Sequence, residues 1–328
     1  MNFSIRRAGH VVLRVTDVVQ TKTFLETIVG FTTYGRIGRD FFFMTSHPVS
    51  NHHMIAVRPG KIGERLPDAD RQIGMVSIAY EVTDLGAMQD LQQRIATAQA
   101  TYPWRILAME DRGAIYNLVV TDGDKNHYEF WCGVPGKENS TIEDLTLRGT
   151  VALSATDEPH KASKTAPTTP PSRLEIRRTS HLTLRCRDVA ATQQFYENAL
   201  GMFLVARDER DRRYFSADAS TRRIVLALEP AKDRGAPGPT PKTMYGMEHY
   251  SLEVSSFADL QHVYRRFKTI GVPVDHTQDH GVTASIYFHD PDGNLMEVYH
   301  DVPRAEIPVP EDPFVSFGGI EDRLERVP

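Results

Sequence analysis

The sequence predicts an α+β protein of four βαβββ modules, paired into two similar domains that each curve a mixed sheet around a central cavity. Two observations predict this fold. The two halves of the 328-residue chain resemble each other at a spacing of about 170 residues. Within each half, a short strand pattern leads twice into a capped amphipathic helix, and further strand patterns follow.

The internal repeat consists of four segment pairs that occur in the same order in both halves. They are Gly9–Asp17 with Ser180–Asp188, Phe24–Gly30 with Phe195–Gly201, Gly74–Val82 with Gly246–Val254, and Asp122–Glu129 with Asp290–Glu297. Because the offset is nearly constant, we interpret the halves as copies of one two-module unit.

Helix signals are clearest in the second half. Asp188 is expected to cap a helix that ends at Gly201, and Ser255-Ser256 a helix that ends near Gly271. We therefore expect an N-terminal domain over 1–135, a Pro/Thr/Lys-rich linker over 136–174 and a C-terminal domain over 175–303. The tail, 304–328, is expected to pack on the surface without regular structure.

Composition excludes several function classes. The formal net charge is −5 with no basic stripe, so we expect no nucleic-acid partner. No apolar run resembles a signal peptide or reaches membrane-spanning length, and Cys132 and Cys186 are isolated thiols. These features predict a cytoplasmic enzyme or small-ligand binder. We also expect it to form a homo-oligomer, because such sheets leave edges exposed.

A β-hairpin is expected around the turn Asp290-Pro291-Asp292-Gly293-Asn294. Folding about Asp292 places Tyr287 opposite Glu297, on the face that the apolar side chains leave free. A phenol beside a carboxylate on the polar face indicates a site. For the hairpin alone, a solvated outer face is the simpler interpretation.

Three metal-ligating groups occupy comparable strand positions in the second half. Alternation turns His181 and His249 away from their apolar neighbours, and Glu297 lies on the polar face. If the strands form one curved sheet, these three side chains converge. Two imidazoles and one carboxylate are the ligand set typical of non-haem Fe(II).

The first half provides an internal comparison. The positions matching His181, His249 and Glu297 are His10, Ser77 and Glu129, and Val119 matches Tyr287. A serine hydroxyl is a poor substitute for an imidazole ligand. We therefore interpret the N-terminal domain as a copy without metal.

The four-module plan with this ligand set resembles the vicinal oxygen chelate superfamily, and specifically its two-domain type I extradiol dioxygenases. The resemblance is sharpest over the segment from His280 to Tyr299. It implies cleavage of a small catechol-type diol with O2, at Fe(II) or alternatively Mn(II) held by His181, His249 and Glu297. It also implies that Tyr287 and His280 bind the substrate and assist proton transfer, with His276 as a weaker candidate for the role of His280.

One departure from this family concerns acid–base chemistry. Its members usually carry a further histidine about fifteen residues before the second metal ligand, and the segment 231–245 has none. Lys242 or Tyr245 is a possible substitute. The pair His52-His53 is expected to lie on a strand of the metal-free domain.

Two other functions stay open. The first is a glyoxalase-like lyase or isomerase that uses Zn or Ni as a Lewis acid; such enzymes commonly take ligands from different modules and include a second glutamate. The other is a metal-free binding protein similar to the bleomycin-resistance proteins, against which the intact ligand set argues.

Overall fold

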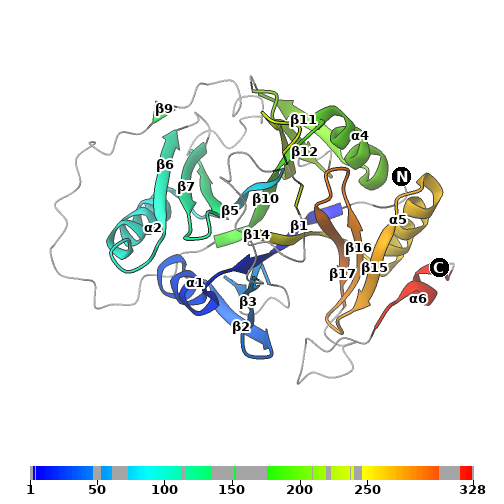
Figure 1. Ribbon diagram of the computed structural model, residues 1–328, viewed down its shortest axis with the longest axis horizontal. Coiled ribbons are helices and arrows are strands. Elements are labelled where there is room, and N and C mark those ends of the chain that lie inside the picture. The colour runs from blue at the N-terminus through cyan, green and yellow to red at the C-terminus, as the bar shows by residue number, and fades with distance from the viewer. Residues whose placement is uncertain are drawn as a thin grey trace.

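A computed structural model describes residues 3, 5–46, 53–60, 73–111, 115–134, 151–152, 176–208, 210–218, 223–236, 238–239, 246–302 and 318–326. The expected α+β fold of four βαβββ modules is confirmed (Figure 1). Lys242, Tyr245 and His52 lie outside the described residues, as do most of the expected linker and tail.

The four modules follow one another along the chain. Module 1 comprises β1 (Ile5–Val15), α1 (Val18–Phe24), the π-helical turn η1 (Leu25–Val29), β2 (Thr32–Ile37), β3 (Phe41–Thr45) and β4 (Ile55–Pro59). Module 2 comprises β5 (Gly74–Val82), α2 (Leu85–Ala98), β6 (Arg105–Asp111), β7 (Ile115–Thr121) and β8 (His127–Gly133). Module 3 comprises β10 (Ile176–Cys186), α4 (Val189–Leu200), β11 (Phe203–Arg207), β12 (Arg213–Ser216) and β13 (Ile224–Pro230). Module 4 comprises β14 (Gly246–Val254), α5 (Phe257–Ile270), β15 (Val274–Asp279), β16 (Thr283–His289) and β17 (Leu295–Asp301).

Among the described residues, two short elements lie outside the modules. The first, β9 (Val151–Ala152), lies within the expected linker and pairs with β6 of module 2. The second, α6 (Glu321–Glu325), lies in the tail, where no regular structure was expected. It forms because Ile320 and Leu324 are buried in the core beside α5.

The helix ends agree with the predicted capping. Asp188 accepts hydrogen bonds from Ala190 N and Ala191 N at the start of α4, and Gly201 ends this helix in the left-handed conformation with φ 67°. Ser256 caps α5 in the same way. These ends are set by local sequence, which explains why the pattern alone located them.

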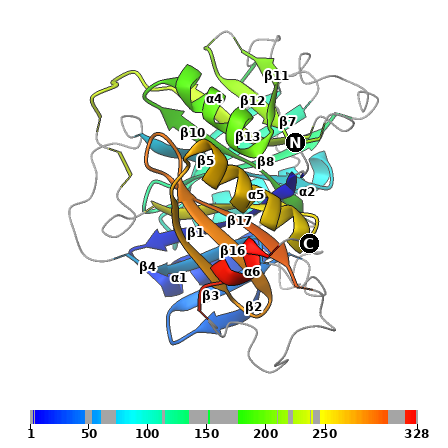
Figure 2. The same cartoon turned by 90° about the vertical axis from the view of Figure 1, so that its right-hand side faces the viewer.

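The modules pair differently from the expected order. One sheet has the strand order β15-β16-β17-β14-β1-β4-β3-β2 and joins module 1 to module 4. The other has the order β11-β12-β13-β10-β5-β8-β7-β6-β9 and joins module 3 to module 2. In Figure 2 the sheet of modules 2 and 3, with cyan and green strands, lies above the sheet of modules 1 and 4, with blue and orange strands. The predicted domains 1–135 and 175–303 therefore do not correspond to the two sheets.

Repeated charges explain why the sequence did not indicate this pairing. Where β1 meets β14, Arg6 and Arg7 bind the buried carboxylate of Glu253. Where β10 meets β5, Arg178 Nε donates to Glu81 Oε2 at 2.6 Å. Because Arg7 and Arg178 are equivalent in the repeat, as are Glu81 and Glu253, either pairing of the strands satisfies the same charges.

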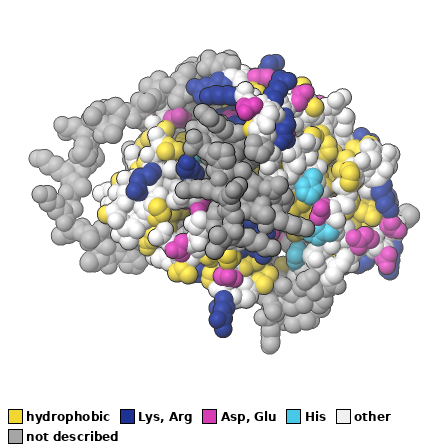
Figure 3. Space-filling model, in the orientation of Figure 1, with side chains coloured by type: hydrophobic (Ala, Val, Ile, Leu, Met, Phe, Trp, Pro, Cys, Tyr) yellow, Lys and Arg dark blue, Asp and Glu magenta, His cyan; other side chains and the backbone are white. Residues whose placement is uncertain are grey.

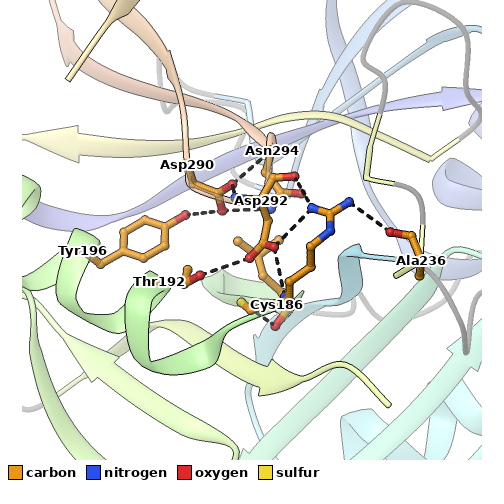
Figure 4. Close-up of polar contacts among 9 residues, drawn as sticks. Cys186, Thr192, Tyr196, Ala236, Asp290, Asp292 and Asn294 are labelled. Carbon is orange, nitrogen blue, oxygen red and sulfur yellow. Dashed lines mark hydrogen bonds and ion pairs between the residues drawn. The ribbon is translucent and has the colours of Figure 1, made fainter. Parts of the chain in front are cut away.

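The turn between β16 and β17 fastens module 4 to module 3 (Figure 4). Asp292 accepts hydrogen bonds from Arg187 N and Thr192 Oγ1, both at 3.0 Å, at the start of α4. Asp290 is buried and accepts one from Tyr196 Oη at 3.1 Å. This turn joins the two sheets through hydrogen bonds to buried carboxylates.

The helices of consecutive modules also pack together. The Phe24 ring of α1 stacks on Trp104 with ring centroids 3.9 Å apart, just after α2. In the second half, α4 packs against α5. Among the described residues, no helix combines the length and hydrophobicity needed to cross a membrane.

Candidate active site

Three side chains from both halves of the chain meet in the sheet of modules 1 and 4. His10 lies on β1, His249 on β14 and Glu297 on β17, and all three are buried. Glu297 Oε2 is 3.0 Å from His10 Nε2 and 3.3 Å from His249 Nε2, and the two Nε2 atoms are 3.3 Å apart. All donor atoms of the three residues lie within 4.8 Å of one another.

A local irregularity of β1 orients His10. Between Ala8 and Val11, β1 has one more residue than the facing part of β14, which forms a bulge at Gly9 and His10. Ser251 holds this bulge, because its Oγ accepts from His10 N at 2.6 Å and donates to His10 O at 3.1 Å. A Cβ at Gly9 would lie 2.5 Å from Ser251 Oγ and 2.6 Å from the Tyr299 ring, so only glycine allows this approach.

The expected ligand His181 does not belong to this group, which corrects one member of the predicted set. His181 lies on β10 in the other sheet, where it pairs with Ala79. His181 would meet His249 and Glu297 only if modules 3 and 4 shared a sheet, whereas module 3 pairs with module 2. His10, the equivalent residue of module 1, takes its place beside His249 and Glu297.

The equivalent position in the other sheet carries no such donor set. Its buried carboxylate, Glu129, accepts hydrogen bonds from Ser77 Oγ at 2.6 Å and Asn117 Nδ2 at 2.9 Å. Val119 faces Glu129 at the register position where Tyr287 faces Glu297. Both Glu129 oxygens therefore have hydrogen-bond partners.

Tyr287 links Glu297 to His280, and the hairpin has the predicted register. Tyr287 lies opposite Glu297, and its hydroxyl donates to Glu297 Oε1 at 3.1 Å. His280 Nε2 lies 3.2 Å from the same hydroxyl. Since the hydroxyl proton points to Glu297, the Nε2 tautomer of His280 can donate to the phenol oxygen.

Burial changes the acidity of these groups. Burial, and then the charge of Glu297, raise the pKa of Tyr287 well above its ordinary value. Burial lowers the pKa of His280, although Glu297 opposes this effect. Burial by itself raises the pKa of Glu297, but the adjacent imidazoles of His10 and His249 outweigh burial and hold it well below its usual range.

Two further histidines line the same space. The His276 ring stacks on Tyr287 with centroids 4.2 Å apart, and its Nδ1 is 2.7 Å from Asp275 Oδ2. The His53 ring lies 3.8 Å from that of His10, directly before β4. Since module 1 contributes His10 to the donor group, His53 lies beside this group and not, as was expected, in a domain apart from it.

The side chains surround a cavity of about 220 Å³. His10, His53, His249, His276, His280, Tyr287 and Glu297 line one part of it, and Tyr34, Ile37, Phe41, Phe43, Val282 and Leu295 form an apolar wall. Histidine side chains also gather at the surface beside β15–β17, next to acidic ones (Figure 3). The cavity therefore combines metal-ligating groups, proton-transfer groups and aromatic side chains.

His10 and His53 are the functional candidates that sequence reasoning missed. A signal for them existed in the distribution of histidines. The second half lacks a histidine in 231–245, whereas module 1 carries His53 after His10. Modules 1 and 4 together supply the donor group and the additional histidine, His53, which neither half of the chain supplies alone.

Comparison with known proteins identifies related sequences. Residues 178–298 match the family model described as the Glyoxalase/Bleomycin resistance protein/Dioxygenase superfamily. The chain is 30% identical over 124 residues to biphenyl-2,3-diol 1,2-dioxygenase 3 of Rhodococcus globerulus, which covers 38% of the chain and 63% of the relative. It is also 30% identical over 125 residues to virulence protein STM3117 of Salmonella typhimurium, covering 38% of the chain and 83% of that relative. The chain thus spans less than two thirds of the dioxygenase it matches.

Solved structures share the fold at low sequence identity. A Bacillus subtilis protein provisionally named a dioxygenase has a TM-score of 0.65 at 15% identity, covering 99% of this chain and 92% of that one. Glyoxalase I of Zea mays has a TM-score of 0.55 at 17% identity, and the match covers 90% of this chain and 92% of that one. At these identities the likeness establishes the fold alone.

Proposed function

We propose, since the chain belongs to the glyoxalase/bleomycin resistance protein/dioxygenase superfamily, that it is an extradiol dioxygenase. It would insert both atoms of O2 into a catechol-type aromatic diol at Fe(II), with Mn(II) as the alternative metal. The observation that carries the proposal is the buried group of His10, His249 and Glu297, which opens into a cavity lined by Tyr287 and His280. The dioxygenase relative supports the same reaction class.

The donor set fits a divalent metal. Glu297 Oε2 is buried and accepts no hydrogen bond of normal geometry from the described residues, although both imidazole Nε2 atoms lie within 3.3 Å of it. A cation would satisfy this oxygen and both nitrogens at once. His10, His249 and Glu297 would hold it. Fe(II) held there would supply a Lewis acid that lowers the pKa values of the diol hydroxyls, and a redox-active centre for the reaction with O2.

Tyr287 and His280 would position the diol and receive its proton. Because the pKa of Tyr287 is raised, its hydroxyl stays protonated at neutral pH and remains a hydrogen-bond donor. Because the pKa of His280 is lowered, its imidazole is neutral at pH 7. With the diol bound, the Nδ1–H tautomer would replace the Nε2–H tautomer that faces Tyr287, and Nε2 would then accept a proton. The stacked His276 would keep the Tyr287 ring in place and limit access of water from the exposed side.

His53 is the best candidate for the acid–base group that the segment before His249 lacks. Its ring lies against His10, is 91% buried and lines the cavity. A histidine there can donate a proton to an oxygen atom bound beside His10. Phe43 packs edge-on against His53 with ring centroids 4.9 Å apart, which fixes the position of the imidazole.

A glyoxalase-like lyase or isomerase is the alternative function. The fold shared with glyoxalase I favours it, as does the origin of the ligands in different modules. Such an enzyme commonly uses a second glutamate, and Glu248 does line the cavity. Glu248, however, pairs with Arg14 at 2.9 Å and Arg58 at 3.2 Å and is no member of the donor group. The second glutamate is thus already engaged by arginines, which favours the dioxygenase.

Oxygen uptake tests the proposal. Purified protein is loaded with Fe(II) without air, mixed with a panel of catechols, and exposed to a measured amount of O2. We expect one O2 consumed per diol and a yellow ring-opened product. The alternative would be established by two results together. The iron-loaded protein would consume no O2 with any catechol, and protein loaded with Zn or Ni would isomerise a glutathione hemithioacetal.

A further inference from the structure

A group of charged residues lies in the cavity at some distance from the metal ligands. Glu248 Oε2 is 2.9 Å from an Nη atom of Arg14, and Glu248 Oε1 accepts a hydrogen bond from Arg58 at 3.2 Å. Arg58 and Glu248 line the cavity, and Arg14 lies behind them with 12% of its side chain exposed. We call these three residues the arginine cluster.

Strand geometry fixes the cluster relative to the metal ligands. His10, Val12 and Arg14 share one face of β1, so the Cα atoms of His10 and Arg14 are about 13 Å apart along the strand. Arg58 lies beside Arg14 on β4. A bulge in β14 adds Glu248 between the residues that face Val12 and Leu13, and it turns Glu248 towards the arginines.

A row of aromatic rings connects the two ends of the cavity. Phe43 contacts His53 with ring centroids 4.9 Å apart, and Phe41 contacts Phe43 at 4.5 Å. The guanidinium carbon of Arg58 lies 4.8 Å from the Phe41 ring centroid. An aromatic substrate lying along this wall with its diol at the metal ligands therefore directs a ring substituent to Arg58.

The cluster has an excess of positive charge and unused donors. Two guanidinium groups face one carboxylate, so one positive charge is left uncompensated within the cluster. Among the described residues, neither the Arg14 nor the Arg58 Nε has a hydrogen-bond partner. Burial lowers the pKa of Arg14; Glu248 raises it, and the like charge of Arg58 lowers it again.

The equivalent group of the other sheet also has two arginines and one glutamate, but it uses more of the guanidinium donors. There Arg185, the counterpart of Arg14, donates to Glu229 Oε1 from Nε at 3.0 Å and from an Nη atom at 2.7 Å. Arg212 donates to the second oxygen of Glu229 at 2.7 Å. Glu229 also occupies the register position that Arg58 occupies in the metal-site sheet. The unused Nε of Arg14 and an arginine, in place of a glutamate, beside it on the neighbouring strand are therefore specific to the sheet that carries the cavity.

We propose that the arginine cluster binds an anionic substituent of the substrate, so that the substrate is a catechol with a carboxylate-bearing side chain. The identification of the substrate as a diol rests on the proposed function, whereas the anion site does not. A guanidinium can bind a carboxylate through two parallel N–H···O bonds. Arg58 makes the direct contact, and Arg14 keeps Glu248 from neutralising Arg58 completely.

Binding of a probe without a diol tests the anion site separately from the chemistry. Dissociation constants of 3-phenylpropionate and its neutral amide are measured by calorimetry on the wild type, Arg58→Gln, Arg58→Lys and Arg185→Gln. We expect the wild type to prefer the carboxylate by roughly tenfold or more. Arg58→Gln abolishes this preference and Arg58→Lys keeps part of it. The matched control Arg185→Gln leaves it unchanged, with thermal unfolding checked for each variant.

Turnover by the iron-loaded enzyme provides the second measurement. Arg58→Gln should lower the ratio of kcat/KM for a catechol with a carboxylate side chain to kcat/KM for unsubstituted catechol by roughly tenfold, whereas the matched control Arg185→Gln should leave this ratio unchanged. Equal binding of carboxylate and amide probes by the wild type would overturn the proposal, even if catechols are cleaved. A carboxylate preference that depends on Arg58, without oxygen uptake, would keep the anion site and refute the dioxygenase.

Discussion

Asp290, in the turn that fastens module 4 to module 3, makes the stability of the protein depend on pH. Its carboxyl group is buried and accepts hydrogen bonds from Asp292 N, Asn294 N, Asn294 Nδ2 and Tyr196 Oη. Burial nevertheless raises the pKa of Asp290 from 3.8 to about 6. The folded state therefore binds a proton at the Asp290 carboxylate more tightly than the unfolded state does.

The sign and size of the effect follow from this difference. Between pH 4 and pH 6 the folded state holds more protons, so the contribution of Asp290 to the free energy of unfolding falls as pH rises. At about 1.4 kcal/mol per pKa unit, the change from 3.8 to about 6 corresponds to about 3 kcal/mol. The contribution is complete below pH 4 and is lost above about pH 6.

The substitution Asp290→Asn removes the titration while keeping the size of the side chain. Urea unfolding followed by tryptophan fluorescence, at pH values from 4 to 7.5, gives the free energy of unfolding of both proteins. We expect the difference, wild type minus variant, to decrease by about 3 kcal/mol over this range.

Asp188 is the control of opposite sign. Hydrogen bonds from Ala191 N and Ala190 N lower its pKa, so the same difference for Asp188→Asn should increase with pH. A difference for Asp290→Asn that stays constant or increases between pH 4 and 7 would refute the reasoning.

Three further predictions concern the site. Replacing His10 by Ala should weaken Fe(II) binding by more than about 100-fold, because one of three ligands is lost, whereas His181→Ala should stay within about threefold in equilibrium dialysis. Comparable losses in both variants would contradict the ligand assignment. Tyr287→Phe should lower kcat for diol cleavage by about 10²-fold or more at unchanged iron content, and full activity would exclude a role in proton transfer. His53→Ala should also reduce kcat by about 10²-fold with iron affinity intact; loss of iron instead would indicate a ligand.

Local signals in the sequence predicted the modules, the helix ends and the hairpin at the site. Asp188 and Gly201 bound α4 because capping and the left-handed conformation depend on a few neighbouring residues. Tyr287 and Glu297 face each other because a short turn fixes the register of the hairpin. His249 and Glu297 were predicted on adjacent strands of one module, and the structure places them so.

The choice of the third ligand depended on a contact that local sequence does not encode. Module 4 can pair its β14 edge with module 1 or module 3, and both carry a histidine at the required position, His10 or His181. The flanking arginines are duplicated too, as Arg7 and Arg178 show. With equal local signals, only the pairing of strands far apart in the chain distinguishes the two alternatives, and it is decided by packing over the whole molecule.

The position of a bound iron ion tests most directly that one metal centre is assembled from both halves of the chain. Crystals soaked with Fe(II) without air, and measured at the iron absorption edge, give the position as an anomalous density peak. We expect a peak between His10 Nε2, His249 Nε2 and Glu297 Oε2 and none beside His181 or Glu129. A peak at His181, or iron bound elsewhere with the three side chains free, would contradict it.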